Sequence, residues 1–424
     1  MFSGMTSDLI SIHNTHLLTI SPWIMRPIHT FLLLACMLTS AFSLSAQILP
    51  SSAFHVNRSG LTNAWHAFKK TGKGRVAFMG GSITEGAGWR DSVCQYLSSR
   101  FPETTFEFIN AGISSTGSTP GAFRFSQDVL AAGPVDLLFE EAAVNDPTNG
   151  FTATYQLRGM EGIIRQARIS NPNMDVIIMH CVDPDKLADY DKGVVPEVIG
   201  QHERVAEHYR ANTIHLAKEV YARIKAGEFT WKDDFKDLHP SPFGHGVYAR
   251  SIRTFLSAAF EQAENARPGP HKLPKMIDPA SYSMGHYVNI KEASDLKGFM
   301  YNDFWRPTDG AGTRKRYVSV PVLEGNIPGS ELTLSFKGKG VGICITSGPD
   351  AGMVEYEIDG RIRGMKQLHT RWSQSLHLPW YIMLEDELSP GSHTLKLRIS
   401  SEKDERSKGS AVRIHQFLVN GPKE

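Results

Sequence analysis

The residues Phe78-Met79-Gly80-Gly81-Ser82-Ile83-Thr84 join a strand-like run to a helix-like run. Residues 75–79 are mostly apolar and predict a buried strand, and residues 89–100 carry apolar side chains at helical spacing. The glycines before Ser82 permit a tight turn and leave its hydroxyl open to approach at the end of the strand. Ser82 is therefore a candidate nucleophile, although these seven residues alone favour an ordinary strand-to-helix turn with a capping serine.

Strand-like and helix-like segments alternate from residue 75 to residue 262. This alternation is typical of an α/β domain, in which helices cover both faces of a parallel sheet. Ligands of such domains bind at the carboxyl ends of the strands. The predicted strands are residues 75–79, 105–109, 136–140 and 174–180, and the predicted helices are residues 89–100, 123–132, 157–170, 196–226 and 246–262.

Three later segments place polar residues after strands or in a late loop, where they could complete a hydrolase site around Ser82. They are Asn110-Ala111-Gly112, Val144-Asn145-Asp146 and Asp237-Leu238-His239. His239 is the candidate base, because imidazole titrates near neutrality and can take the proton of a serine hydroxyl. The amide of Asn145 can donate to a developing oxyanion, together with the backbone N–H of Ser82. Taken alone, His239 could be an ordinary surface histidine and Asn145 an ordinary turn asparagine. The presence of all four segments in one domain favours a catalytic role for both residues.

Charged residues near these segments are candidates for binding a substrate. Glu140 and Glu141 end an apolar strand, which is an unusual place for two carboxylates. One of them could bind a sugar hydroxyl or pair with Arg124, and we favour the pairing. We retain Glu141, Arg124 and Asp146 as the candidate substrate-binding residues.

The four segments resemble the sequence blocks of the SGNH hydrolases, also called GDSL-like esterases and lipases. Gly80-Gly81-Ser82-Ile83-Thr84 is similar to the first block, residues 110–118 to the second, residues 143–146 to the third and residues 237–239 to the last. The resemblance implies a flavodoxin-like three-layer α/β/α fold with a parallel sheet, and hydrolysis through an acyl-enzyme. It also implies that Ser82 is the nucleophile, Asn145 the oxyanion amide and His239 the base.

Two departures affect the first and second blocks. The chain has Gly-Gly-Ser-Ile where many members have Gly-Asp-Ser-Leu, and the serine is kept. The glycine of the second block is replaced by Ser115, whose backbone N–H is our third predicted oxyanion donor. That role requires a backbone shape that usually needs glycine, and Gly112 and Gly117 are the nearby alternatives.

A third departure concerns the acid that orients the histidine. The family acid usually lies three residues before the histidine, where this chain has Lys236. We predict that Asp237, two residues before His239, has taken over the role. Asp234 and a backbone carbonyl are the alternatives.

The sequence after Ala263 is different in character. Residues 264–275 are proline-rich and predict a linker between a catalytic domain at residues 47–263 and a second domain at residues 276–424. Short strand-like runs separated by turn signals predict an all-β sandwich, jelly-roll-like, for the second domain. The aromatic residues of this domain are Trp305, Trp372, Trp380 and Tyr381. They could stack on sugar rings, but the sequence is at least as consistent with their filling the core of the sandwich.

Residues 1–46 are predicted to be a signal peptide. Residues 25–29 form a short basic start, residues 31–38 are almost wholly apolar, and small residues then lead to a cleavage site after Ala46. Residues 1–24 are then an upstream extension. A secreted or periplasmic location follows, with lipoprotein processing at Cys36 as the weaker alternative.

Composition argues against several classes of function. The formal net charge is +1, which gives no support for binding nucleic acid or an anionic membrane surface. Three cysteines follow the cleavage site at wide spacing, which predicts neither a disulfide framework nor a metal site. We expect no cofactor and no metal, and the oligomeric state is not indicated.

The sequence favours a secreted carbohydrate esterase that removes acetyl or other small acyl groups from a glycan. A lipase or general acyl-ester hydrolase is one alternative, although no long apolar loop lies near the catalytic segments. A second alternative is a glycan-binding protein whose hydrolase domain is inactive. A third is a glycosidase that uses carboxylates such as Glu141 and Asp146.

Overall fold

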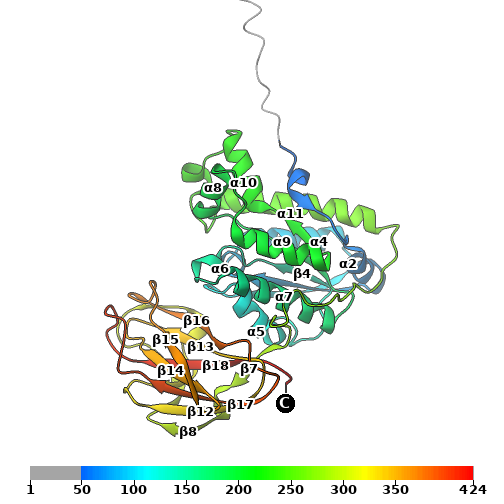
Figure 1. Ribbon diagram of the computed structural model, residues 1–424. Helices are drawn as coiled ribbons and strands as arrows, with labels where there is room; N and C mark the ends of the chain where they lie inside the picture. The colour runs from blue at the N-terminus through cyan, green and yellow to red at the C-terminus, as the bar shows by residue number, and fades with distance from the viewer. Residues whose placement is uncertain (1–48, 424) are drawn as a thin grey trace, which may run out of the picture. The chain divides into compact units, whose positions relative to one another are not determined.

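The computed structural model describes residues 49–423 (Figure 1). The predicted signal peptide, its cleavage site at Ala46 and the alternative site at Cys36 lie outside the described residues. Within residues 49–423, none of the helices combines the length and the apolar character that crossing a membrane requires.

A six-stranded sheet forms the centre of the first half of the chain, in the order β1-β6-β5-β4-β2-β3. Strands β2 to β6 pair in parallel, and β1 pairs with β6 in the antiparallel direction. The strands are β1 (His55–Val56), β2 (Lys73–Gly80), β3 (Thr105–Gly112), β4 (Leu137–Glu140), β5 (Asp175–Met179) and β6 (Asn212–Ile214).

Helices cover both faces of this sheet because side chains alternate along each strand. In β2, Phe78 belongs to the core under the face of α2, α4, α10 and α11, whereas Ala77 and Met79 belong to the core under α5, α7 and α9. The helices are α2 (Thr62–His66), α3 (Ser82–Glu85), α4 (Trp89–Arg100), α5 (Ser118–Asp128), α6 (Asn145–Thr148), α7 (Ala153–Ser170), α8 (Pro184–Asp191), α9 (Glu197–Tyr209), α10 (Leu216–Lys225) and α11 (Pro242–Ala263). The predicted three-layer α/β arrangement is confirmed.

One short strand was not predicted. The run that we expected to be helical over much of residues 196–226 is two helices, α9 and α10, separated by β6. Arg210 ends α9 in the left-handed conformation, with φ at 53°, and the chain then enters the sheet. The strand has three residues, which is too short for its period-two pattern to be distinguished from the helical pattern on either side.

The second half of the chain is an antiparallel β-sandwich apart from one short parallel pair, β10 with β16. One sheet has the order β10-β16-β13-β18-β11-β9 with β7 paired to β18, and the other has the order β15-β14-β17-β12-β8. Leu334 and Leu397 from one sheet pack with Ile343 and Ile414 from the other in a shared core. The all-β prediction is therefore confirmed.

The strands of the sandwich are β7 (Gly285–Asn289), β8 (Ala293–Lys297), β9 (Met300–Trp305), β10 (Gly312–Thr313), β11 (Val320–Gly325), β12 (Glu331–Gly338), β13 (Gly340–Ser347), β14 (Met353–Ile358), β15 (Arg361–Gln367), β16 (Leu376–Glu385), β17 (Gly391–Ile399) and β18 (Val412–Asn420). Among the aromatic residues singled out above, Trp305 and Tyr381 are buried, and Trp380 packs against the sandwich core. Trp372 keeps 43% of its surface exposed.

The sandwich contacts the α/β domain directly. Residues from Leu49 onward form one compact unit, and the core under α5 and α7 includes Phe123 together with Tyr381 of the sandwich. Arg158 of α7 donates to Asp278 and to Asp386, each at 2.8 Å. No helix or strand lies between Ala263 and Gly285 in the described chain. The division into residues 47–263, 264–275 and 276–424 remains our proposal.

Candidate active site

Ser82 lies directly after β2 and begins the short helix α3. Its hydroxyl oxygen is 2.7 Å from Nε2 of His239, so the two predicted catalytic side chains are hydrogen-bonded. The ends of β2, β3 and β4 are level here, with Gly80 opposite Gly112 and Met79 opposite Glu140. The site is therefore at the carboxyl edge of the parallel sheet, as the fold rule predicts.

The loop that carries His239 is anchored on both sides. Ser241 caps α11 by accepting from the N–H of Gly244 at 3.2 Å, and its hydroxyl donates to the carbonyl of Asp234. Phe235 is buried, and its carbonyl accepts from the N–H of Ser241 at 3.0 Å. These contacts fix the loop ends and leave the exposed His239 free to meet Ser82.

Lys236 adopts an uncommon backbone conformation, with φ at 79° and ψ at −55°. The N–H of Asp237 donates to the carbonyl of Phe235 at 3.2 Å, which closes a tight three-residue turn around Lys236. The turn points the Asp237 carboxylate to its own neighbour, since it accepts from the N–H of Leu238.

The structure does not bring the predicted acid to the histidine. Within residues 49–423, neither Asp237 nor Asp234 is hydrogen-bonded to His239; Asp234 accepts from the N–H of Thr230 at 2.8 Å and from its hydroxyl at 3.2 Å. The arrangement present is a serine–histidine pair.

Ser115 has the backbone shape that its predicted oxyanion role requires. Its φ is 70°, in the left-handed region that glycine adopts most readily. Serine there costs roughly 1 kcal/mol relative to glycine. The side-chain amide of Asn149 donates to the carbonyl of Ser115 at 3.0 Å and holds the turn in place.

Asn145 lies against the serine turn. A Cβ atom built on Gly81 would stand 2.0 Å from Oδ1 of Asn145, far inside any contact distance. The absence of a side chain at Gly81 therefore allows the amide of Asn145 to approach the backbone next to Ser82. The Gly-Gly-Ser sequence of the first block thus leaves room for Asn145.

Glu141 is fully buried beneath the serine turn and does not reach a substrate, contrary to our expectation. One of its carboxylate oxygens lies 3.5 Å from the N–H of Gly81 and 3.5 Å from the hydroxyl of Thr84. Burial raises the pKa of Glu141 to about 7, and burial also raises the pKa of Glu140 well above its ordinary value.

Arg124 is also buried, and the pairing that we favoured with Glu140 or Glu141 is not found. It forms an ion pair with Asp128, one turn further along α5, at 3.0 Å. It donates to the carbonyls of Ala111 and Gly80, so it ties the ends of β3 and β2 together. Arg124 lies on α5, and sequence does not show which face of the helix is buried or which carboxylate the guanidinium reaches.

Asp146 is the third predicted substrate contact, and it is buried too. It accepts from the N–H and hydroxyl of Ser118, at 2.7 Å and 2.6 Å, and it is bonded to Nε2 of His202 at 3.0 Å. These bonds fix the Asn145 segment to the start of α5. Glu141, Arg124 and Asp146 therefore position the catalytic segments from below.

A cavity of about 380 Å³ opens beside the nucleophile. One wall is formed by the α/β domain and the other by a sandwich segment that includes the short helix Lys315–Tyr317. The residues that line it are Ser82, Glu85, Gly86, Ile113, Ser114, Thr313, Arg314, Lys315, Arg316 and Tyr317. We did not predict the sandwich segment from sequence; the run Arg314-Lys315-Arg316 was the available signal.

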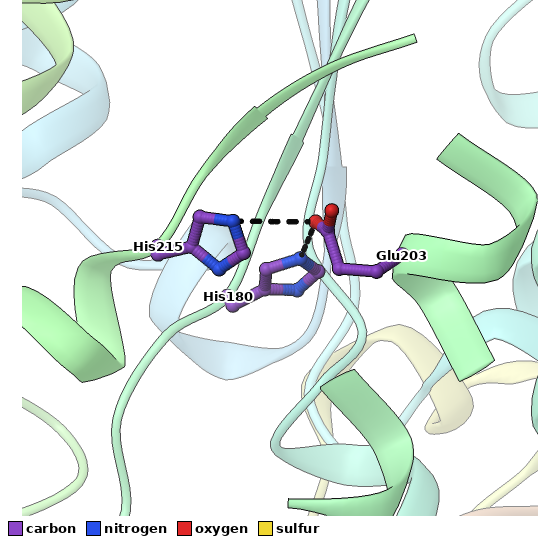
Figure 2. Close-up of side chains that lie close together, drawn as sticks. All are labelled: His180, Glu203 and His215. Carbon is purple, nitrogen blue, oxygen red and sulfur yellow. Dashed lines mark hydrogen bonds and ion pairs between the residues drawn. The ribbon is translucent and has the colours of Figure 1, made fainter. Parts of the chain in front are cut away.

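His180, Glu203 and His215 meet near the ends of β5 and β6 (Figure 2). One oxygen of Glu203 is 2.8 Å from Nε2 of His180 and 3.6 Å from Nε2 of His215, and the three possible ligand atoms lie within 4.8 Å of one another. The other oxygen is ion-paired with Arg58 at 2.6 Å. Burial lowers the pKa of His215 to about 4. The group has the donor types of a zinc site, but Arg58 already neutralises its carboxylate.

Comparisons with known proteins give a family for part of the chain and a shared fold. Residues 78–247 match the model of the GDSL-like Lipase/Acylhydrolase family. Two crystal structures of a two-domain esterase active on acetylated mannans share the fold at 20% identity, over 88% of this chain and 98% of theirs. Their TM-scores are 0.69, for the one co-crystallised with mannopentaose, and 0.70. No curated protein matches the sequence. Residues 78–247 are therefore a GDSL-like lipase/acylhydrolase domain, and the protein is a hydrolase of ester bonds.

Proposed function

We propose that the protein is a secreted carbohydrate esterase that removes acetyl or other small acyl groups from a glycan through an acyl-serine intermediate. The observation that carries the proposal is the 2.7 Å hydrogen bond between Ser82 and His239 at the wall of a cavity that the β-sandwich also lines. A serine hydroxyl bonded to an imidazole is an activated nucleophile.

In the first half of the reaction, Nε2 of His239 takes the hydroxyl proton of Ser82 while the oxygen attacks the ester carbonyl. The negative charge on the carbonyl oxygen is held by the N–H groups of Ser82 and Ser115 and by the amide of Asn145. The protonated His239 then gives its proton to the departing sugar oxygen. This leaves an acyl group on Ser82 and a free sugar hydroxyl.

In the second half, His239 takes a proton from water, and the hydroxide attacks the acyl carbonyl. The same donors hold the second oxyanion. When the intermediate collapses, the carboxylic acid leaves and His239 returns the proton to Ser82. One ester and one water are consumed, and one acid and one alcohol are released.

Three observations support a sugar ester with a small acyl group. The solved structures of similar fold belong to an esterase active on acetylated mannans. The cavity beside Ser82 is lined by Glu85 and three cations, which suit a polar substrate better than a fatty acyl chain. On the sandwich, Trp372 is partly exposed, and its neighbour Arg371 donates to the carbonyl of Thr148, close to Asn145.

The structure argues against the glycosidase and the inactive binding protein. Glu141 and Asp146 are fully buried, so they cannot flank a glycosidic bond. The hydrogen bond between Ser82 and His239 is what an active hydrolase requires.

Export is part of the proposal and rests on the sequence of residues 25–46. Expression with the native leader and N-terminal sequencing of the released protein test it. We expect the mature chain to begin at Gln47. A mature chain that begins at Cys36 and carries lipid would replace secretion by membrane anchoring.

The activity is tested by hydrolysis of p-nitrophenyl acetate and p-nitrophenyl octanoate, and by acetate release from acetylated polysaccharides. We expect turnover of acetate, little turnover of octanoate, and acetate release from a glycan, all lost in Ser82→Ala. Faster hydrolysis of the octanoate ester would favour a lipase. The same acetate turnover in Ser82→Ala would overturn the mechanism.

A further inference from the structure

The cavity beside Ser82 carries an excess of positive charge. Arg314, Lys315 and Arg316 line it from the sandwich, and Glu85 is the one acidic residue among the described residues that line it. Glu85 is already engaged, because one of its oxygens accepts from the N–H of Ser114 at 2.8 Å and from its hydroxyl. The cavity that contains the catalytic serine is thus lined by three cations and by one carboxylate, which is already hydrogen-bonded.

The segment that carries these cations is held firmly. Tyr317 is buried in the core shared with the α/β domain, where its hydroxyl lies 3.2 Å from that of Tyr381. The N–H of Arg314 donates to the carbonyl of His377 at 3.2 Å. Arg316 reaches across to the α/β domain, where its Nε lies 3.8 Å from Glu85 and its Nη2 is 3.4 Å from the carbonyl of Asn110.

The cations differ in what they already contact. The guanidinium of Arg316 is already engaged with Glu85 and with the carbonyl of Asn110 in the α/β domain. The Nε of Arg314 is buried without a hydrogen-bond partner among the described residues, and Lys315 is exposed with no ion pair in residues 49–423. The other nitrogens of the Arg314 guanidinium also form no ion pair and no hydrogen bond within residues 49–423, so they can donate to a ligand. Arg314 and Lys315 are therefore free to bind an anion.

We propose that this segment is an anion subsite, and that the acylated sugar which the enzyme recognises carries a carboxylate or a sulfate group. The inference rests on the proposed function, since the same cavity must hold the ester against Ser82. The guanidinium of Arg314 offers a planar pair of donors that matches either group, and Lys315 adds a mobile charge. The sandwich thereby selects the sugar while the α/β domain performs the hydrolysis.

A second cavity extends this charged surface. It measures about 370 Å³, shares Ile113, Arg316 and Tyr317 with the first, and adds Lys291 and Asp128 to its lining. A chain of sugars that passes over Arg316 would lie in both cavities. The subsite therefore suits an oligosaccharide better than a single sugar.

The test uses the full chain and three acetylated oligosaccharides that share one backbone: one neutral, one with a uronate and one with a sulfate ester. Acetate release gives kcat/KM for each, at low and high ionic strength. We expect the better anionic substrate to exceed the neutral one by about tenfold at low salt, and the preference to shrink as salt screens the charges. Comparison of the uronate substrate with the sulfate substrate shows which of the two anionic groups the subsite prefers.

Two variants and a control locate the preference. In Arg314→Gln with Lys315→Gln the ratio of anionic to neutral kcat/KM should fall to about one, and Lys315→Gln alone should lower it partway. Lys403→Gln, an exposed cation that lines neither cavity, should keep the wild-type ratio. Thermal unfolding checks each fold, and the single exposed Lys315 variant keeps the test valid where the double variant does not fold.

Binding of the same oligosaccharides to Ser82→Ala, measured by calorimetry, separates this inference from the proposed function. Preferential binding of an anionic oligosaccharide without Ser82-dependent turnover in the wild type would support the subsite and overturn the function. Turnover that depends on Ser82 with equal rates on all three oligosaccharides would overturn the subsite and leave the function standing. A preference unchanged in both the double variant and the Lys315→Gln variant would also overturn it.

Discussion

The hydroxyl of Ser82 lies 2.7 Å from Nε2 of His239, although 157 residues separate them in the chain. The parallel sheet makes this possible, because it delivers Ser82 at the end of β2, and the loop before α11 returns His239 to the same edge. The bond orients the imidazole to take the serine proton. Every step of the proposed reaction depends on this pair.

The first prediction concerns His239. Replacement by alanine removes the group that takes and returns the proton, so kcat on p-nitrophenyl acetate should fall by about 10³-fold. His208→Ala is the matched control, because His208 is an exposed histidine on α9. A His239→Ala enzyme that keeps a tenth or more of the wild-type rate would exclude His239 as the base.

The second prediction concerns Asp237. Its carboxylate accepts from the N–H of Leu238 and not from His239, and an asparagine oxygen can accept the same bond. Asp237→Asn should therefore lower kcat by less than tenfold, whereas removal of a true triad acid costs about 10⁴-fold. Steady-state rates across pH 6 to 9 decide this, and a loss on the larger scale would establish Asp237 as the acid.

The third prediction concerns Gly81. A Cβ here would lie 2.0 Å from Oδ1 of Asn145, so Gly81→Ala must push the amide away from the serine turn. The loss of one oxyanion donor should lower kcat by about 10²- to 10³-fold, with a smaller effect on KM. Gly246→Ala is the control, since no atom lies within 4 Å of its added Cβ. Unaltered kcat in Gly81→Ala would mean that Asn145 does not hold the oxyanion.

The fourth prediction concerns the buried Glu141, whose pKa is raised from 4.5 to about 7. The folded state therefore binds a proton that the unfolded state releases between these values, so this group's contribution to stability is full below pH 4.5 and is lost as pH rises to 7. The maximal loss is on the order of 3 kcal/mol.

Urea unfolding of wild type and Glu141→Gln between pH 5 and 8 measures this contribution. As pH rises, the wild type should lose unfolding free energy relative to Glu141→Gln, because the glutamine side chain does not titrate. The exposed Glu264→Gln should show no such trend. A pH-independent difference for Glu141→Gln would mean that the carboxyl is already ionised in the folded protein.

Local patterns predicted the fold and the reacting pair. The apolar run before Ser82 clearly predicts a buried strand. Asn145 follows another predicted strand and His239 lies in a late loop, and both positions are typical of catalytic residues in an α/β domain. The backbone conformation of Ser115 could not be predicted from its residue type. A non-glycine residue with φ at 70° is rare, so the residue type argued against the shape that the structure has.

Two features of the site could not be predicted. Glu141 and Asp146 follow a strand end just as catalytic residues do, and Arg124 lies on a helix. Their burial depends on contacts with residues distant in the chain, such as Ser118 and His202 against Asp146. Arg314 and Lys315 lie more than 200 residues from Ser82 along the chain, on another domain. Their approach depends on how the sandwich docks, which no local pattern encodes.

The central claim is that Ser82 forms the covalent intermediate. A serine-directed fluorophosphonate, followed by mass spectrometry of the digested protein, tests it most directly. We predict one adduct, on Ser82, together with loss of esterase activity, and much slower labelling in His239→Ala. Full inactivation with the adduct on another residue, or esterase activity that persists when Ser82 is fully labelled, would contradict the account.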